Sequence, residues 1–284
     1  LEPRFSMRYQ ITPRQSLNLA YGLHNQMQPL PVYYNRNLDG SLSENLDLDF
    51  TRSHHFVLGH QVNLTPSIYL KSEVYFQAIG NVPVEQDPSS FSMLNAGNDF
   101  GLPSNTDLVN EGIGRNYGVE FTLEKFFSNN YYFLVTSSFF KSEYQGSDNI
   151  WRSTAFDGGY VVNLLAGKEW KVGNGNVIAL DWKVTAAGGR KYTPVNTEAS
   201  LATGEEIRFE DRAFSEQLSD YFRADVKIFY RKNHKKFTQE FGIDIQNITN
   251  HQNIFAQRYN RRTGELIEEP QLGIFPVPQY RILF

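Results

Sequence analysis

The sequence predicts an all-β protein, a transmembrane antiparallel up-and-down β-barrel of which about eleven strands are present. Three observations lead to this fold class. Apolar side chains recur with a period of two residues, short turns alternate with long polar loops, and each strand is long enough to cross a bilayer at a tilt. The period indicates strands, and the connections indicate how the strands follow one another.

The alternation of apolar and polar side chains is clearest in the first segment. There Phe5, Met7, Tyr9 and Ile11 alternate with polar residues, which fits a strand and not a helix of 3.6 residues per turn. Crossing the hydrocarbon at a tilt takes about 9–11 residues, and the runs are of that size. The same pattern recurs at residues 17–24, 68–77, 117–124, 131–139, 160–167, 178–185, 222–230, 237–246 and 279–284, and least regularly at 52–63.

The connections between these segments alternate in length without exception. Short turns are expected at residues 12–15, 65–67, 128–130, 173–176 and 233–236. Long polar loops are expected at about 26–50, 80–112, 144–157, 187–217 and 249–275. A soluble β-sandwich would mix loop lengths between its two ends, whereas outer-membrane barrels keep short periplasmic turns and long extracellular loops. The alternation therefore favours a barrel in the outer membrane of a Gram-negative bacterium.

Composition is compatible with this prediction and excludes other classes. The mean hydropathy is −0.46, and no run approaches the ~18 apolar residues of a membrane helix, but alternating barrel strands average out as mildly polar. Aromatic residues make up 14% of the chain, as expected for girdles at two membrane interfaces. Cysteine is absent, which excludes disulfides and thiolate metal sites. The net charge of −4, without a basic stripe, argues against a nucleic-acid partner.

The last strand carries a separate signal. Tyr280, Ile282 and Phe284 share one face, and Phe284 ends the sequence. A terminal aromatic residue on an amphipathic strand resembles the signal that the barrel-assembly machinery of Gram-negative bacteria reads. The alternative is a strand that ends in phenylalanine by chance.

Several blocks of the sequence resemble the second half of the barrel of TonB-dependent outer-membrane receptors, in the form common in Bacteroidetes. They are loose one by one but specific in their order and spacing. The blocks are Glu2-Pro3-Arg4, Tyr21-Gly22-Leu23-His24, residues 29–34, residues 70–77, Asn81-Val82-Pro83-Val84, Gly188-Gly189-Arg190, Tyr192-Thr193-Pro194, Asp220-Tyr221-Phe222-Arg223, residues 246–250 and residues 280–284.

The resemblance implies a barrel of about 22 strands that is occluded by an N-terminal plug and preceded by a segment that contacts TonB. Residues 1–284 would then be the C-terminal part of one barrel domain, with the plug domain and the N-terminal strands outside this chain. An open half-barrel would leave two unpaired edges in lipid. The implied partners are the TonB complex through the missing N-terminal part, the rest of the barrel and plug, the barrel-assembly machinery, outer-membrane lipid and, as a further option, a surface lipoprotein.

No catalytic constellation is recognised in the sequence, so neither an enzyme, a metal site nor a cofactor is expected. His54, His55 and His60 have a spacing that could suggest metal ligation, but exposed histidines near a loop need no such explanation. Acidic residues on the polar faces fit a lumen better than acid–base pairs: Glu73, Glu120, Glu124, Glu240 and Asp244.

Ligand contacts are expected on the long loops, because binding residues concentrate on loops held by a rigid scaffold. The predicted function is uptake of a scarce nutrient (a siderophore, cofactor, glycan or peptide) with energy supplied through TonB. The alternatives are a passive porin-like channel, a barrel enzyme and a soluble β-sandwich binding module. Packing within the loops is an equally good interpretation of each candidate contact: Tyr33, Tyr34, Arg36, Phe100, Arg190 and Tyr192.

Overall fold

The computed structural model describes residues 1–37, 39–98, 101, 103–173 and 175–284, and one antiparallel sheet dominates it. Eleven strands follow one another in sequence order, each paired with the next, which confirms the predicted fold class. They are β1 (Arg4–Thr12), β2 (Gln15–Gln26), β3 (Thr51–Thr65), β4 (Ile68–Glu85), β5 (Leu108–Ser128), β6 (Tyr131–Gln145), β8 (Tyr160–Val172), β9 (Asn176–Ala187), β12 (Tyr221–Asn233), β13 (Thr238–Gln246) and β16 (Phe275–Leu283).

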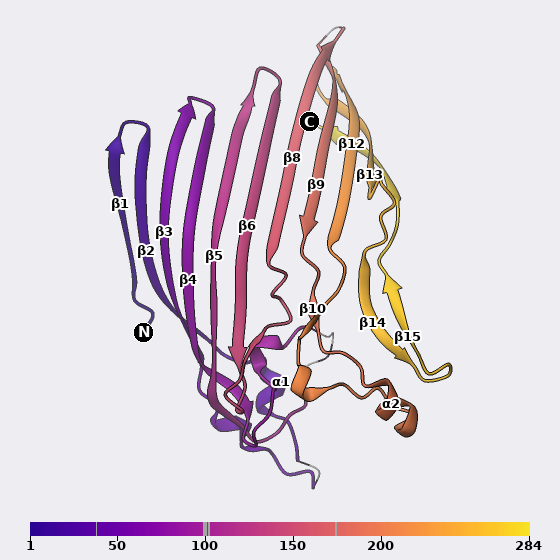
Figure 1. The fold of residues 1–284 in the computed structure, drawn as a ribbon. Coiled ribbons are helices and arrows are strands. Elements are labelled where there is room, and N and C mark those ends of the chain that lie inside the picture. Colours follow the sequence, from indigo (N-terminus) through magenta and orange to yellow (C-terminus); the bar gives the residue numbers. More distant parts are fainter. Residues whose placement is uncertain (38, 99–100, 102, 174) are drawn as a thin grey trace.

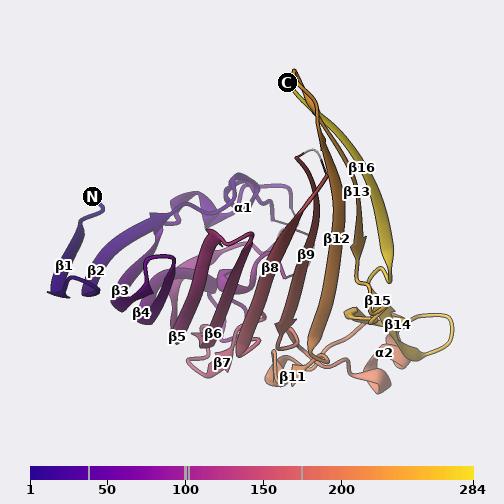
Figure 2. The same ribbon diagram turned by 90° about the horizontal axis from the view of Figure 1, so that it is seen from above.

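The sheet is curved into an open wall whose short turns lie at one end and whose long loops lie at the other (Figure 1). Seen from above, the strands follow an arc from β1 to β16, and helix α1 (Leu30–Tyr33) lies on the concave side (Figure 2). In the described part of the chain, β1 and β16 are the two ends of the strand order. The short turns and the long loops lie at opposite ends of the sheet, as the sequence predicted.

The tight turn between β5 and β6 illustrates how the sequence sets a hairpin. Asn129 and Asn130 both have positive φ, 55° and 64°, the conformation that two-residue hairpin turns require and that asparagine tolerates well. Beside them, the ammonium of the buried Lys125 donates to the carbonyl oxygens of Phe126, Ser128 and Tyr131 at 2.9–3.3 Å. One side chain thereby binds three backbone carbonyls around the turn.

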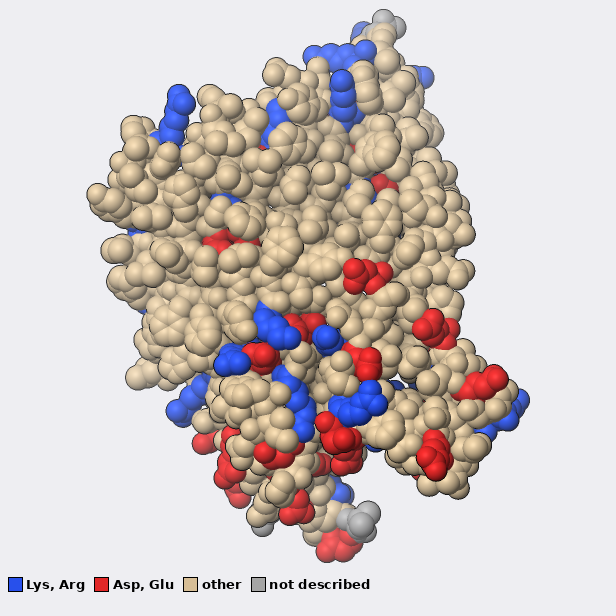
Figure 3. Space-filling view, in the orientation of Figure 1, with Lys and Arg blue, Asp and Glu red and all other residues tan. Residues whose placement is uncertain are grey.

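The convex face of the sheet carries the apolar half of each strand. Strand register places Leu58, Val74 and Val119 in one row across β3, β4 and β5, and side chains that share a row share a face. Figure 3 shows a broad band with few charged side chains over this face, with Lys, Arg, Asp and Glu most dense at its loop end and some Lys and Arg at its turn end. Such a band matches the lipid-facing surface of an outer-membrane barrel.

Two strands are much longer than the expected length of about 9–11 residues. Strand β4 has 18 residues and β5 has 21, so they reach into the region predicted as a loop at 80–112. Their excess length continues beyond the apolar band, where a strand is no longer limited by bilayer thickness. The periodicity near residues 80–85 and 108–112 is too irregular for the sequence alone to show this extension.

The regions predicted as polar loops contain small elements of their own. These are strands β7 (Trp151–Ser153), β10 (Lys191–Tyr192), β11 (Glu216–Gln217), β14 (Ile254–Asn260) and β15 (Glu265–Pro270), helix α2 (Thr197–Thr203), and 3₁₀ helices at Glu44–Asp47, Met93–Asn95 and Glu210–Arg212. No helix among the described residues is long and apolar enough to span a membrane.

The main buried cluster of side chains lies under the loops and not behind the sheet. It joins the loop after β2, the 3₁₀ helix at Met93–Asn95 and the extended ends of β4 and β5. Burying these apolar side chains fixes the loops against one another, because each buried side chain contributes roughly 1.5–3 kcal/mol. The cluster comprises Val32, Tyr33, Leu48, Val82, Met93 and Leu108.

We expect neighbouring positions on β5 to face different media. Phe121 belongs to the apolar face and is 43% exposed in this chain, whereas Glu120 lies on the concave face. Spin labels at positions 121 and 120 of the complete protein in lipid should therefore differ: the label at 121 should be accessible to oxygen and the label at 120 to a water-soluble relaxant. Equal aqueous access at both positions would contradict the membrane orientation.

Candidate functional site

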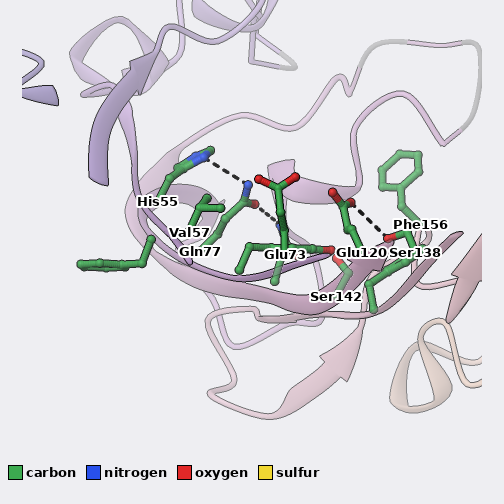
Figure 4. A pocket seen from close by; sticks show the side chains of 12 residues that line it. His55, Val57, Glu73, Gln77, Glu120, Ser138, Ser142 and Phe156 are labelled. Atoms are coloured by element: carbon green, nitrogen blue, oxygen red, sulfur yellow. Dashed lines mark hydrogen bonds between the residues drawn. The ribbon is translucent and has the colours of Figure 1, made fainter. Parts of the chain in front are cut away.

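The concave wall carries a cavity of about 490 Å³ that spans β3 to β6. Glu73 on β4 and Glu120 on β5 are register partners, and both carboxylates are directed into the same space (Figure 4). Lys71 Nζ lies 2.6 Å from a carboxylate oxygen of Glu73. Glu120 accepts a hydrogen bond of 3.2 Å from the Ser138 hydroxyl. Two carboxylates with one cation leave this wall acidic.

Neutral polar groups continue the wall beyond the carboxylates. The Gln77 amide lies 3.2 Å from the His55 ring, and Asn116 donates to Gln77 at 2.8 Å (Figure 4). The described residues contain no group of three or more His, Cys, Asp or Glu side chains that could hold a metal ion. The wall can therefore offer hydrogen bonds and negative charge to whatever occupies the lumen.

The three histidines considered as metal ligands are separated by the strand itself. His54 and His55 are adjacent on β3 and point to opposite faces. On the convex face, His54 lies 3.1 Å from the Tyr21 hydroxyl, while His55 faces Gln77 on the concave side. His60 is on the His54 face but roughly 20 Å along the strand at ~3.4 Å per residue.

A second cavity, of about 450 Å³, lies at the loop end of the barrel. The loop after β4, strand β10, the segment after α2 and strand β14 all contribute to it. Among the sequence-predicted contacts, it brings together Arg190 and Tyr192. Three further cations were missed by sequence reasoning, because nothing in their local pattern separates them from solvated loop charges: Lys191, Arg208 and Arg258.

Two glycines place Arg190 beside this cavity. A Cβ on Gly188 would lie 1.7 Å from the carbonyl oxygen of Gly158, and one on Gly189 would lie 1.9 Å from the carbonyl oxygen of Leu218. No side chain fits at either position, so the backbone segments approach closely only with glycine. The following Arg190 then reaches Asn98, donating to its backbone and side-chain oxygens at 2.6 Å each.

Tyr192 enters the cavity from the small β10–β11 sheet, where it pairs with Glu216. Burial, together with the nearby Glu216 and Glu268, raises the pKa of its phenol. The hydroxyl thus stays protonated at neutral pH and remains available as a hydrogen-bond donor.

The other predicted loop contacts lie elsewhere. Tyr33 is buried in the loop cluster and its hydroxyl accepts a hydrogen bond from the Gln28 backbone N–H, which gives it a packing role. Tyr34 is exposed, and Arg36 donates to the Gly40 carbonyl oxygen at 2.7 Å within its own loop. Phe100 lies outside the described residues.

The C-terminal residues lie at the end of the sheet that carries the short turns (Figure 1). Tyr280 is on the convex face, where its ring packs on Phe241 with centroids 4.9 Å apart, and Gln239 donates to its hydroxyl at 2.9 Å. Ile282 shares that face, and Phe284 is fully exposed. The placement agrees with a periplasmic interface but does not test an assembly signal.

Asn45 is a key residue of the loop end that sequence reasoning missed. Its fully buried amide donates to the carbonyl oxygens of Val32 and Asn105, and its oxygen accepts the Leu108 N–H, all at 2.9 Å. One side chain therefore ties two loops to the start of β5. A lone asparagine in a polar loop gives no signal of this role.

Comparison with known proteins rests on structure alone. No family model matches the sequence, and a search of curated proteins finds no match. The fold matches the ferric-catecholate import receptor Fiu of E. coli K12 (TM-score 0.65, 12% identity, 99% of this chain and 34% of that chain). It also matches the ferric yersiniabactin uptake receptor FyuA of Yersinia pestis (0.65, 11%, 99% and 36%). A third match is the ferripyoverdine receptor of the outer membrane of Pseudomonas aeruginosa (0.60, 12%, 89% and 29%).

The chain has the fold of a receptor barrel. It spans about a third of the length of these receptors, so it corresponds to part of such a barrel. The matched structures are 10–14% identical in sequence to this chain. At this level of identity the comparison shows a shared fold and does not identify a ligand. The predicted location in the outer membrane agrees with the matched receptors, and nothing in the comparison distinguishes a Bacteroidetes type.

Replacing Asn45 should loosen the loops and leave the sheet intact. In Asn45→Ala, the Leu108 N–H and the carbonyls of Val32 and Asn105 lose their partner, at a cost of roughly 1–3 kcal/mol for each buried group left unsatisfied. Amide exchange should accelerate in residues 27–50 and 86–107 and stay slow in the strands. The control is Asn37→Ala, whose amide makes only a surface bond to Ser41. Unchanged loop exchange in Asn45→Ala would contradict the role given to this residue.

Proposed function

We propose that this chain is the C-terminal part of the barrel of an outer-membrane receptor that takes up a scarce nutrient with energy supplied through TonB. The observation that carries the proposal is the match of 99% of the chain to import and uptake receptors. The structured loop end supports it, because the buried cluster and Asn45 hold the loops as a fixed ligand-binding surface rather than as freely moving segments. The remaining barrel strands and a plug domain belong to the proposal as parts outside residues 1–284.

Two surfaces of this chain would have different roles in uptake. Nutrient would bind at the loop-end cavity, where Arg190 and Tyr192 converge. The acidic concave wall would face the plug, and a guanidinium of the plug would be held by Glu73 and Glu120, since these carboxylates otherwise repel one another across β4 and β5. Energy from TonB would then have to break such contacts before the lumen opens.

Conductance through the complete protein in a planar bilayer tests this proposal. The wild type should be closed, because the plug fills the lumen. The double variant Glu73→Gln/Glu120→Gln should show more frequent openings, since neutral amides hold a cationic plug group less strongly than carboxylates do.

The control is Glu265→Gln at the exposed start of β15, which should leave the conductance unchanged. An open wild-type pore would contradict active uptake and favour the passive porin-like channel. A double variant that stays as closed as the wild type would contradict only the proposed contact of the plug with Glu73 and Glu120, and not active uptake.

Loss of Phe284 should reduce assembly and spare ligand binding. The ring of Phe284 is fully exposed at the turn end of the sheet, and the aromatic girdles of outer-membrane barrels lie at the membrane interfaces. Deleting Phe284 from the complete receptor should lower its outer-membrane level several-fold, measured by quantitative blotting, with unchanged affinity in the molecules that remain. Normal receptor levels after the deletion would remove the assembly signal proposed for Tyr280, Ile282 and Phe284.

A further inference from the structure

The loop-end cavity has more positive charge than its own acidic residues neutralise. Among the described residues, four cations and one carboxylate, that of Glu206, line the cavity. Glu206 is already engaged: it pairs with Arg208 and accepts the backbone N–H of Tyr259 at 3.0 Å. Arg258 is likewise paired, with Glu269 at 3.0 Å. In the described part of the chain, the two lining cations that form no ion pair are Arg190 and Lys191.

The Arg190 guanidinium is held in place by Asn98, but not all of its hydrogen-bond donors have a partner among the described residues. Its Nη2 donates to the two oxygens of Asn98, both neutral acceptors. In the part of the chain that the structure describes, its Nε and Nη1 make no hydrogen bond and neither it nor Lys191 forms an ion pair. A guanidinium presents five donors in a planar fork that suits carboxylates and phosphates. Asn98 therefore orients the guanidinium and leaves donors for a ligand.

Adjacent like charges also favour an anionic occupant. Arg190 and Lys191 follow one another in the chain and both line the cavity, so both positive charges would attract an anion that enters it. Tyr192 adds a protonated hydroxyl beside them, and Gln257 adds an amide. The volume of about 450 Å³ is within the range of about 300–1,000 Å³ typical of small-ligand sites.

We propose that Arg190 and Lys191 form an anion-recognition pair, and that the receptor selects a small ligand carrying an oxyanion group such as a carboxylate, phosphate or catecholate. This inference rests on the proposed uptake function and narrows its ligand class. A neutral glycan or a cationic peptide would leave both charges uncompensated. The anion can come from two sources, an iron chelate or a free acidic solute, which share this chemistry.

Binding to the complete receptor in detergent tests the inference with four probes. They are an anionic ferric tris-catecholate, an uncharged ferric tris-hydroxamate of similar size, citrate and inorganic phosphate. Wild-type receptor should bind at least one anionic probe and prefer the anionic chelate to the uncharged one. The double variant Arg190→Gln/Lys191→Gln should weaken that binding by at least about tenfold, since a charge-assisted hydrogen bond contributes about 1.5–3 kcal/mol and 1.4 kcal/mol is tenfold in affinity.

The control removes the same two charges outside the cavity. Arg261 and Arg262 lie in the turn between β14 and β15, and Arg261→Gln/Arg262→Gln should leave binding within about twofold, because exposed charges contribute little. Equal loss in both double variants would attribute the effect to net charge and overturn the inference.

The remaining outcomes separate the inference from the proposed function. Binding of the anionic chelate identifies an iron complex, and binding of citrate or phosphate without iron identifies a free acidic solute; both support the anion pair. Preference for the uncharged chelate, or no binding of any anionic probe, overturns it. In that case, a closed wild-type pore in the planar bilayer would still support a plugged receptor, and an open one would remove the proposed function as well.

Discussion

The pairing of backbone hydrogen bonds between neighbouring strands is the constraint on which the rest of this structure depends. In hydrocarbon an unpaired N–H or C=O costs several kcal/mol, so a strand can cross only when both sides are bonded. The ladder from β1 to β16 meets this condition at every internal strand. At the turn between β5 and β6, the Lys125 ammonium donates to the carbonyl oxygens of Ser128 and Tyr131. The two ends of this ladder are β1 and β16, and the proposed larger barrel would pair each of them with a further strand.

The loop end of the molecule is an extension of the same ladder. Strands β4 and β5 continue beyond the apolar band and supply the floor on which the loops pack. Asn45 then ties two loops to the start of β5. Gly188 and Gly189 pack against the backbone of Gly158 and Leu218, where no side chain would fit. Arg190 is held at the cavity as a consequence of both. Position, and not residue type alone, makes it a candidate ligand contact.

Sequence periodicity was sufficient for the fold because each strand has one face toward lipid. Phe56, Leu58 and Val62 lie on the convex face with the apolar residues of the neighbouring strands, even though the segment 52–63 was the least regular in sequence. The loops were harder, because their packing depends on contacts between distant residues. Tyr33 and Tyr34 are adjacent aromatic residues in one loop, yet the first is buried and the second exposed. Likewise, no local pattern distinguishes Asn45 from the other loop asparagines, or Arg208 from a solvated charge.

The central claim is that this sheet is one portion of a larger barrel that encloses a plugged lumen. The most direct measurement is a structure of the complete protein in a lipid bilayer, examined at the two edges of the sheet. The account predicts that β1 and β16 each form a full antiparallel ladder with strands outside residues 1–284, with the convex face in lipid. Direct pairing of β1 with β16, which would close the eleven strands on themselves, would contradict it.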